Sequence, residues 1–237
     1  MSPARKTQDL VFYVLFAATA ASFIYDIHLI FFRTPIELTM GIVQKIFYFH
    51  VPAAYAMYLA AGACCLGSIA YLWSPNDARD AFAKAGAETA VVFGLIVMIT
   101  GPLWGAKAWG RYWTWDPRLT TTMLTVLIYV AYVLLRSFAG EGEAEKKFAA
   151  ALGILGGPML YIIHISVQKW GGQHPVVIGS GGQGIAKSML PALFVSLGAF
   201  TLLTVVLLWT RTKIEMARAR LRQIEEEAVS VLPEGST

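Results

Sequence analysis

Long apolar segments, separated by short polar connections, make up most of the chain. A transmembrane helix needs about 20 predominantly apolar residues to cross a hydrocarbon core about 30 Å thick. Lipid offers the backbone no hydrogen-bonding partner, so such segments must be helical. The pattern predicts six spans, at residues 10–32, 46–73, 85–103, 121–135, 148–167 and 189–210. The fourth is the shortest, and we expect it to take in residues from the segment before it.

The composition agrees with an all-α polytopic membrane protein. Hydrophobic residues make up 57% of the chain and charged residues 14%, and the mean hydropathy is +0.57. A soluble domain averages about 25% charged residues. The first span carries Asp26 and His28 near one end and lacks a small-residue cleavage site, so we interpret it as a true span. We predict a six-helix membrane domain, 1–210, followed by a charged tail, 211–237.

The basic residues predict the orientation of the helices. With the N-terminus inside, 12 of the 19 Lys and Arg residues fall on the inner side, where such residues are normally enriched. Both termini are then cytoplasmic, and segments 104–122 and 168–188 are outer loops. The region 211–227 alternates cations and carboxylates, which is typical of a solvated, salt-bridged helix. The pI of about 9.1 is better explained by inner-side cations that face anionic lipid than by binding of nucleic acid.

One predicted outer loop is unusually rich in tryptophan. The chain has 7 Trp, and four of them fall in a run of thirteen residues that ends at an aspartate. These residues are Trp104, Trp109, Trp113, Trp115 and Asp116, and the cations among and after them are Lys107, Arg111 and Arg118. Interfacial anchoring needs only scattered Trp residues. Four indoles with three cations instead predict a platform for a large planar ligand that carries negative charge.

The four histidines all fall on the outer side in this topology. They are His28, His50, His164 and His174. Two neutral imidazoles on opposite faces of a porphyrin, with indoles around it, would complete a haem site. Arg118 and Arg111 would then pair with the propionates through charge-assisted hydrogen bonds. A structural zinc site fits less well, because scattered His without nearby Cys do not supply its closed tetrahedral ligand set.

Other motifs do not carry a function here. Cys64 and Cys65 are adjacent and lie in mid-span, so they form no CxxC pair and are best explained by packing. The segment 179–184 fits G-x-G-x-x-G literally but has no βαβ context, which favours a loop. The sequence contains no P-loop motif, so nucleotide hydrolysis by that route is excluded. No catalytic triad or carboxylate pair stands out, and we therefore predict a protein that is not an enzyme.

Three motifs together resemble a known family. The run W-G…W-G-x-x-W-x-W-D-x-R-L-T, at 104–120, resembles the tryptophan-rich "WWD" signature of haem-handling proteins in cytochrome c biogenesis. The segments 48–54 and 173–175 resemble the two histidine motifs that flank this signature. With its length and six spans, the chain is most similar to the haem exporter protein C (cytochrome c maturation protein C) family. The segment 169–173 is richer in glycine than the family pattern.

The resemblance implies a protein that holds non-covalent, b-type haem at the outer face of the inner membrane. His50 and His174 would be the axial ligands of the iron. The haem platform would include Trp104, Trp109, Trp113, Trp115, Asp116 and Arg118. The implied partners are a periplasmic haem chaperone (cytochrome c maturation protein E), an ABC ATPase subunit, a second membrane subunit and a small single-span subunit.

Two alternatives come from other classes of protein. One is a haem lyase of the same superfamily, an enzyme that forms the thioether bonds itself. The lack of extra spans and of a large outer domain speaks against it. The other is a haem-independent transporter subunit, in which the Trp run only anchors the protein in the interface. A Soret band in the purified protein separates this last alternative from a haem protein.

Overall fold

The computed structural model describes residues 3–140, 142–175 and 185–231, and the long elements in these ranges are all α-helices. The helices are α1 (Pro3–His28), α2 (Phe47–Trp73), α3 (Asp77–Trp109), α4 (Pro117–Phe138), α5 (Glu143–Trp170) and α6 (Leu190–Val231). All six belong to stretches that are long and apolar enough to cross a membrane. The all-α architecture with six spans is thus confirmed. The motif at 179–184 lies outside the described residues.

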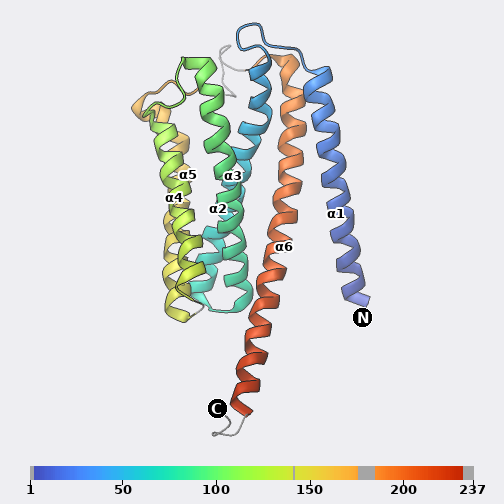
Figure 1. Ribbon diagram of the computed structural model, residues 1–237, viewed down its shortest axis with the longest axis vertical. Helices are drawn as coiled ribbons and strands as arrows, with labels where there is room; N and C mark the ends of the chain where they lie inside the picture. Colours follow the sequence, from blue (N-terminus) through green and yellow to red (C-terminus); the bar gives the residue numbers. More distant parts are fainter. Residues whose placement is uncertain (1–2, 141, 176–184, 232–237) are drawn as a thin grey trace.

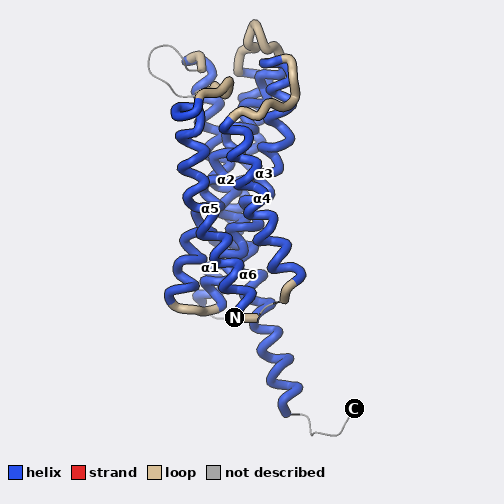
Figure 2. Tube along the Cα trace, turned by 90° about the vertical axis from the view of Figure 1, so that its left-hand side faces the viewer, coloured by secondary structure: helices blue, strands red, loops and turns tan. Residues whose placement is uncertain are grey.

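The helices run side by side along the long axis of the molecule, and both termini lie at the same end (Figure 1). We call this the terminal end and the opposite end the cavity end. Three short helical pieces lie at the cavity end: Leu29–Arg33 continues α1, Ile42–Ile46 leads into α2, and Lys187–Met189 leads into α6. Figure 2 shows loops at the two ends of the bundle, with α6 projecting beyond the terminal end.

The aromatic run is more helical than the expected loop at 104–122. Helix α3 continues to Trp109 and ends at Gly110, whose φ of 72° suits glycine. Trp104 and Trp109 therefore lie on a helix, and residues 110–116 alone separate α3 from α4. Helix α4 begins at Pro117, so the fourth span does take in residues from the preceding segment, as expected.

Close packing of small residues holds α2 against α3. A Cβ atom at Gly86 would lie 2.5 Å from the backbone nitrogen of Cys64, so only glycine fits at this contact. Small residues let helix backbones approach in the same way in many membrane bundles. Cys64 is fully buried there, as expected for a packing residue. At the edge of the bundle, α1 packs against α6 (Figure 1). The Ser196 hydroxyl of α6 donates to the buried carboxylate of Asp26 on α1 at 2.8 Å.

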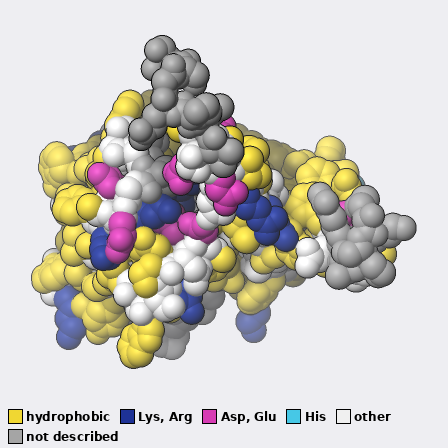
Figure 3. Space-filling view, turned by 90° about the horizontal axis from the view of Figure 1, so that it is seen from below, with side chains coloured by type: hydrophobic (Ala, Val, Ile, Leu, Met, Phe, Trp, Pro, Cys, Tyr) yellow, Lys and Arg dark blue, Asp and Glu magenta, His cyan; other side chains and the backbone are white. Residues whose placement is uncertain are grey.

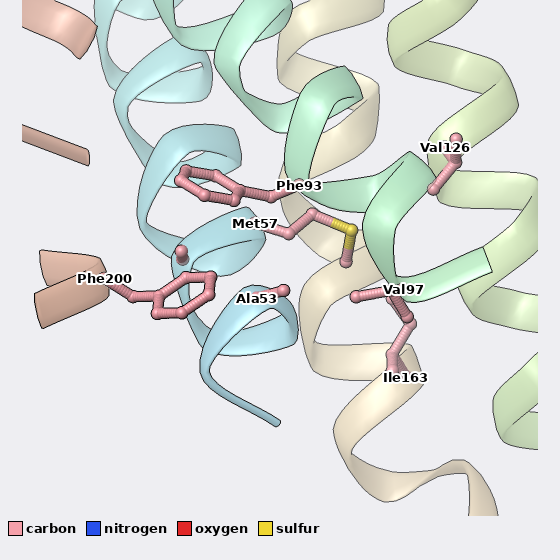
Figure 4. Close-up of a cluster of buried hydrophobic side chains, with 8 residues drawn as sticks. Ala53, Met57, Phe93, Val97, Val126, Ile163 and Phe200 are labelled. Atoms are coloured by element: carbon pink, nitrogen blue, oxygen red, sulfur yellow. The ribbon is translucent and has the colours of Figure 1, made fainter. Parts of the chain in front are cut away.

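The main apolar core lies where α2, α3, α4, α5 and α6 meet (Figure 4). Met57 of α2 and Phe93 of α3 are each 1% exposed, so this core is fully excluded from solvent and lipid. Val97 and Ile163 face the same cluster from α3 and α5 (Figure 4). Three members of this core, Met57, Val97 and Ile163, also line the cavity described below.

Charged side chains at the terminal end join α6 to the bundle. Lys84 of α3 pairs with Glu215 of α6 at 2.9 Å, and Arg211 pairs with Glu88 at 2.5 Å. Figure 3, which views this end, shows Lys and Arg next to Asp and Glu at the centre of a hydrophobic rim. The tail was expected to be a solvated, salt-bridged helix. It does form pairs along its own helix, such as Arg218 with Glu215, but its first turns pack on α3 and are continuous with the sixth span.

Candidate functional site

A cavity of about 460 Å³ opens among α2, α3, α4 and α5 near the cavity end. This volume is within the range of about 300–1,000 Å³ that is typical of cofactor and ligand sites. The wall is mostly apolar, with a few convergent polar groups. The aromatic members are Phe47, Tyr58, Trp104, Trp109 and Trp113, and the polar or charged members include His50, Arg118, His164, Gln168 and His174.

His50 reaches the cavity from the first turn of α2. Its Nδ1 lies 2.9 Å from the hydroxyl oxygen of Thr100 on α3. The next residue on α3 is Gly101, where an added Cβ would lie only 3.1 Å from Cε1 of the imidazole. The His50 ring is therefore held against α3 by one hydrogen bond and by the absence of a side chain at Gly101.

His174 reaches the same cavity from the segment that follows α5. Its Nδ1 lies 3.1 Å from the carbonyl oxygen of Pro175 and 3.4 Å from Nη1 of Arg118. The indole of Trp109 lies beside the ring, with centroids 6.5 Å apart. Burial lowers the pKa of His174, and the charge of Arg118 lowers it further. Both effects favour the neutral ring, which is the form that ligates a metal.

Two of the tryptophans are positioned by the last turns of α3. Trp104 donates from Nε1 to the side-chain oxygen of the buried Gln44, at 3.4 Å. The rings of Trp104 and Trp109 meet edge to face, with centroids 5.7 Å apart. Gly105 makes room for Trp109, since a Cβ there would lie 3.0 Å from the indole. Trp113, beyond the helix, completes the aromatic part of the wall.

Trp115 and Asp116 are not on the cavity wall, although the sequence placed them in the platform. Trp115 is 75% exposed and touches Trp113 edge to face at 5.8 Å. Asp116 is buried and has a structural position. One carboxylate oxygen caps α4 by accepting from the backbone N–H of Arg118 at 2.9 Å, and the other accepts from the N–H of Gln173 at 2.6 Å.

Asp116 therefore fastens the segment before His174 to the start of α4. The unusual glycines at 171 and 172 fit this contact. Gly172 has a φ of +146°, and a Cβ there would lie 2.4 Å from an Asp116 oxygen. Glycine at position 172 thus has a local steric reason, because a side chain there would clash with the carboxylate of Asp116.

Arg118 is the cation that lines the cavity in the aromatic run. Its Nη2 donates to the backbone oxygen of His164 at 3.2 Å, and its Nε is buried with no hydrogen-bond partner among the described residues. An unpaired buried donor on a guanidinium is costly and suits an anionic ligand. Lys107 and Arg111 are exposed and do not line the cavity, so Arg111 is not placed to pair with a ligand inside it.

Several wall residues were missed by sequence reasoning. Met57 and Tyr58 follow His50 by seven and eight residues, which is the helical spacing of a single face, and this signal was available. Thr100 and Gln44 gave no such signal, because their roles depend on contacts between helices. His164 lines the cavity from α5, whereas His28 stacks on Phe32 at 5.3 Å and does not reach the cavity.

The residues present fit haem. Its porphyrin supplies four ligands to the iron, so the protein needs to add only one or two axial groups. Within the described part of the chain, no three His, Cys, Asp or Glu side chains come together to hold a metal by themselves. The two imidazoles, the aromatic wall and the unpaired guanidinium nitrogen match an iron, an apolar ring and a carboxylate respectively.

The fold defines a polytopic membrane protein with a largely apolar cavity at one end of its bundle. A family model described as "Heme exporter protein C" matches residues 3–227. The heme exporter protein C of Bradyrhizobium diazoefficiens is 33% identical over 193 residues, which cover 81% of this chain and 73% of that protein. The heme exporter protein C of Paracoccus denitrificans is 30% identical over 201 residues, or 80% of each chain.

A further relative comes from Marchantia polymorpha. It is named a putative cytochrome c biosynthesis ccmC-like mitochondrial protein, and it is 30% identical over 179 residues, covering 75% of this chain and 76% of its own length. The chain belongs to the heme exporter protein C family. The family resemblance expected from the WWD run and the two histidine motifs is thereby confirmed.

Proposed function

We propose that this protein binds b-type haem in the cavity and presents it for cytochrome c biogenesis. The observation that carries the proposal is the convergence of His50 and His174, from opposite parts of the chain, on one cavity with Trp104, Trp109 and Arg118. Membership of the heme exporter protein C family supports the same ligand. The iron of haem would accept the two imidazoles as axial ligands.

The side chains divide the work of holding the ligand. The indoles and the aliphatic wall residues cover apolar surface, which contributes about 25 cal/mol for each Å² removed from water. Arg118 offers its free Nε–H to a carboxylate, and Asp116 acts indirectly by holding the segment that carries His174. Every role is one of binding or positioning, so we propose a carrier rather than an enzyme.

We further propose that haem passes from this site to a periplasmic haem chaperone, cytochrome c maturation protein E. The exposed Trp115, in edge-to-face contact with the wall residue Trp113, is suited to meet an incoming protein at the rim. The proposed assembly contains an ABC ATPase subunit, a second membrane subunit and a small single-span subunit. The expected location is the inner membrane, with the cavity on the periplasmic side.

The orientation is supported by the distribution of cations and by the shared end of the termini (Figure 1). A reporter that is active only in the cytoplasm should be active when it is inserted at Gly142, at the terminal end. Activity only of a periplasm-dependent reporter at this position would contradict the proposed orientation.

Purification of the full chain tests the function itself. The protein should show a Soret band of low-spin, six-coordinate haem and should pass the haem to the purified chaperone when the two are mixed. A haem-free protein that cannot be reconstituted would overturn the proposal. Thioether attachment of haem to an apocytochrome by this chain alone would favour the lyase alternative.

A further inference from the structure

Three consecutive residues of α3 are arranged around His50. Thr100 contacts Nδ1 of the imidazole, and Gly101 leaves space for the ring. Pro102 lies inside the helix and cannot donate a backbone hydrogen bond to the preceding turn. In a membrane helix such a proline persists where neighbouring groups compensate for the lost bond. The Thr-Gly-Pro sequence therefore gives this turn of α3 both a hydrogen-bonding partner and space for the His50 ring at the cavity wall.

The single hydroxyl proton of Thr100 is already used. Its oxygen lies 2.6 Å from the carbonyl oxygen of Ile96, a distance that two oxygens adopt when a proton lies between them. The hydroxyl therefore donates to Ile96. It can only accept at its second contact, the 2.9 Å contact with His50. Nδ1 of His50 must consequently carry the hydrogen of the neutral ring.

This assignment leaves Nε2 of His50 with its lone pair free. We infer that Thr100 is a positioning residue that fixes the His50 tautomer, so that Nε2 is always ready to ligate iron at the cavity wall. The inference rests on the proposed haem function. A hydrogen bond to the distal nitrogen of a metal-bound imidazole orients the ring and raises its basicity, and loss of such a partner typically lowers metal affinity by about 10- to 100-fold.

The first test needs no haem. In the full-length chain labelled with 15N-histidine, the nitrogen chemical shifts of neutral His50 show which ring nitrogen carries the hydrogen, and His50→Ala assigns its signals. The parent and Thr100→Ser should show a protonated Nδ1. Thr100→Val, which keeps the shape but loses the acceptor, should show a mixture of tautomers. A protonated Nε2 in the parent would overturn the inference.

The second test uses hemin titration and the midpoint potential of the bound haem. Thr100→Val should bind hemin about 10- to 100-fold more weakly, with a more positive midpoint potential because the imidazole donates less electron density to ferric iron. Thr100→Ser should restore parent behaviour. Thr204→Val is the matched control: the Thr204 hydroxyl likewise donates back one turn, to the carbonyl oxygen of Phe200, and it lies on α6 away from the cavity.

A double-mutant comparison separates positioning from packing. In a His50→Ala background, Thr100→Val should have no further effect on hemin affinity, because the ring that it orients is gone. An equal loss with and without His50, or a Thr100→Ser variant as weak as Thr100→Val, would overturn the role of Thr100 while leaving the haem site in place. A parent chain that binds no hemin overturns the proposed function, and the nitrogen shifts still decide the tautomer.

Discussion

The two histidines of the cavity have very different surroundings. His50 belongs to a continuous helix, and its Nδ1 has one partner, the hydroxyl of Thr100. His174 belongs to a non-helical segment, and its Nδ1 has two partners of opposite kind: the guanidinium of Arg118 is a donor, whereas the carbonyl of Pro175 is an acceptor. One ring nitrogen satisfies only one of them in a given tautomer.

The difference teaches how a carrier can both hold and release a ligand. The His50 side is preorganised, since its helix, its tautomer and its space are all fixed before a ligand arrives. The His174 side is adjustable. Once an anion binds the guanidinium of Arg118, Nδ1 of His174 is free to bond to the carbonyl oxygen of Pro175. In the proposed haem carrier, an asymmetric pair of this kind would keep one bond to iron strong while the other is exchanged. Substitutions on the two sides should therefore have unequal effects.

The largest expected effect is at His50, one of the two proposed axial ligands. His50→Ala should weaken hemin binding by more than about 100-fold, beyond the range for loss of a supporting hydrogen bond, whereas His174→Ala should cost about 10-fold and leave a five-coordinate haem. Hemin titrations and the low-spin to high-spin change in the absorbance spectrum measure both. His28→Ala is the control, since His28 lies outside the cavity. Equal losses at His50 and His174 would break the comparison.

The next effect concerns the two neighbouring indoles. Trp113→Ala removes a half-buried wall residue and should weaken hemin binding by about 2.5 kcal/mol, with the ligation of the iron unchanged. Trp115→Ala removes an exposed ring and should leave hemin affinity within about 0.5 kcal/mol of the parent while slowing transfer to the chaperone. Affinity and transfer rate measured on the same preparations separate the two. A Trp115 variant with the larger loss of affinity would place the ligand outside the cavity.

A smaller effect is expected for the cations. Arg118→Gln should cost about 2 kcal/mol of hemin affinity, because it removes a charge-assisted bond to a propionate. Arg111→Gln, an exposed cation of the same segment, should cost almost nothing. The dimethyl ester of the porphyrin, which lacks free carboxylates, should bind equally to the parent and to Arg118→Gln. A loss at Arg118→Gln that persists with the ester would rule out the propionate role.

The smallest expected effect on affinity is at Asp116, which joins the start of α4 to the segment before His174. Asp116→Ala loses a helix cap worth about 1 kcal/mol and frees the segment that carries His174. Asn76→Ala is the matched control, because it removes the N-cap of α3 at the terminal end without touching the cavity. The two variants should lose similar thermal stability, and only Asp116→Ala should weaken the His174 bond to iron, as seen in the haem spectrum.

The spans were predictable because lipid imposes helical structure on any long apolar segment. The end of α3 was harder. The sequence predicted a loop from residue 104, yet the helix continues to Trp109. Gly101 and Gly105 lie within it, close to the His50 ring and the Trp109 indole, so both glycines serve side-chain packing. The chemistry of the site followed from residue types at unusual density, namely Trp and His near one membrane face.

The contacts that set the site could not be predicted from the sequence. The sequence does not distinguish Thr100 from other threonines of membrane helices, and its role follows only from its contact with His50. The separation of Trp113 from Trp115 depends on which way a seven-residue connection turns, which its composition does not determine. Asp116 could be predicted as a cap from the following proline, but its bond to Gln173 joins two segments far apart in the chain.

Helix α6 has a mechanical consequence that its sequence makes plain. Its 42 residues extend for about 63 Å, roughly twice the hydrocarbon thickness of a bilayer. No glycine or proline interrupts it between Gly198 and Val231, so nothing in this stretch favours a kink. The ion pair of Glu215 with Lys84 of α3 lies part-way along this helix. The projecting end is therefore joined by one uninterrupted helix to the opposite end of the bundle, and a load applied to the tail is transmitted along that helix toward the cavity end.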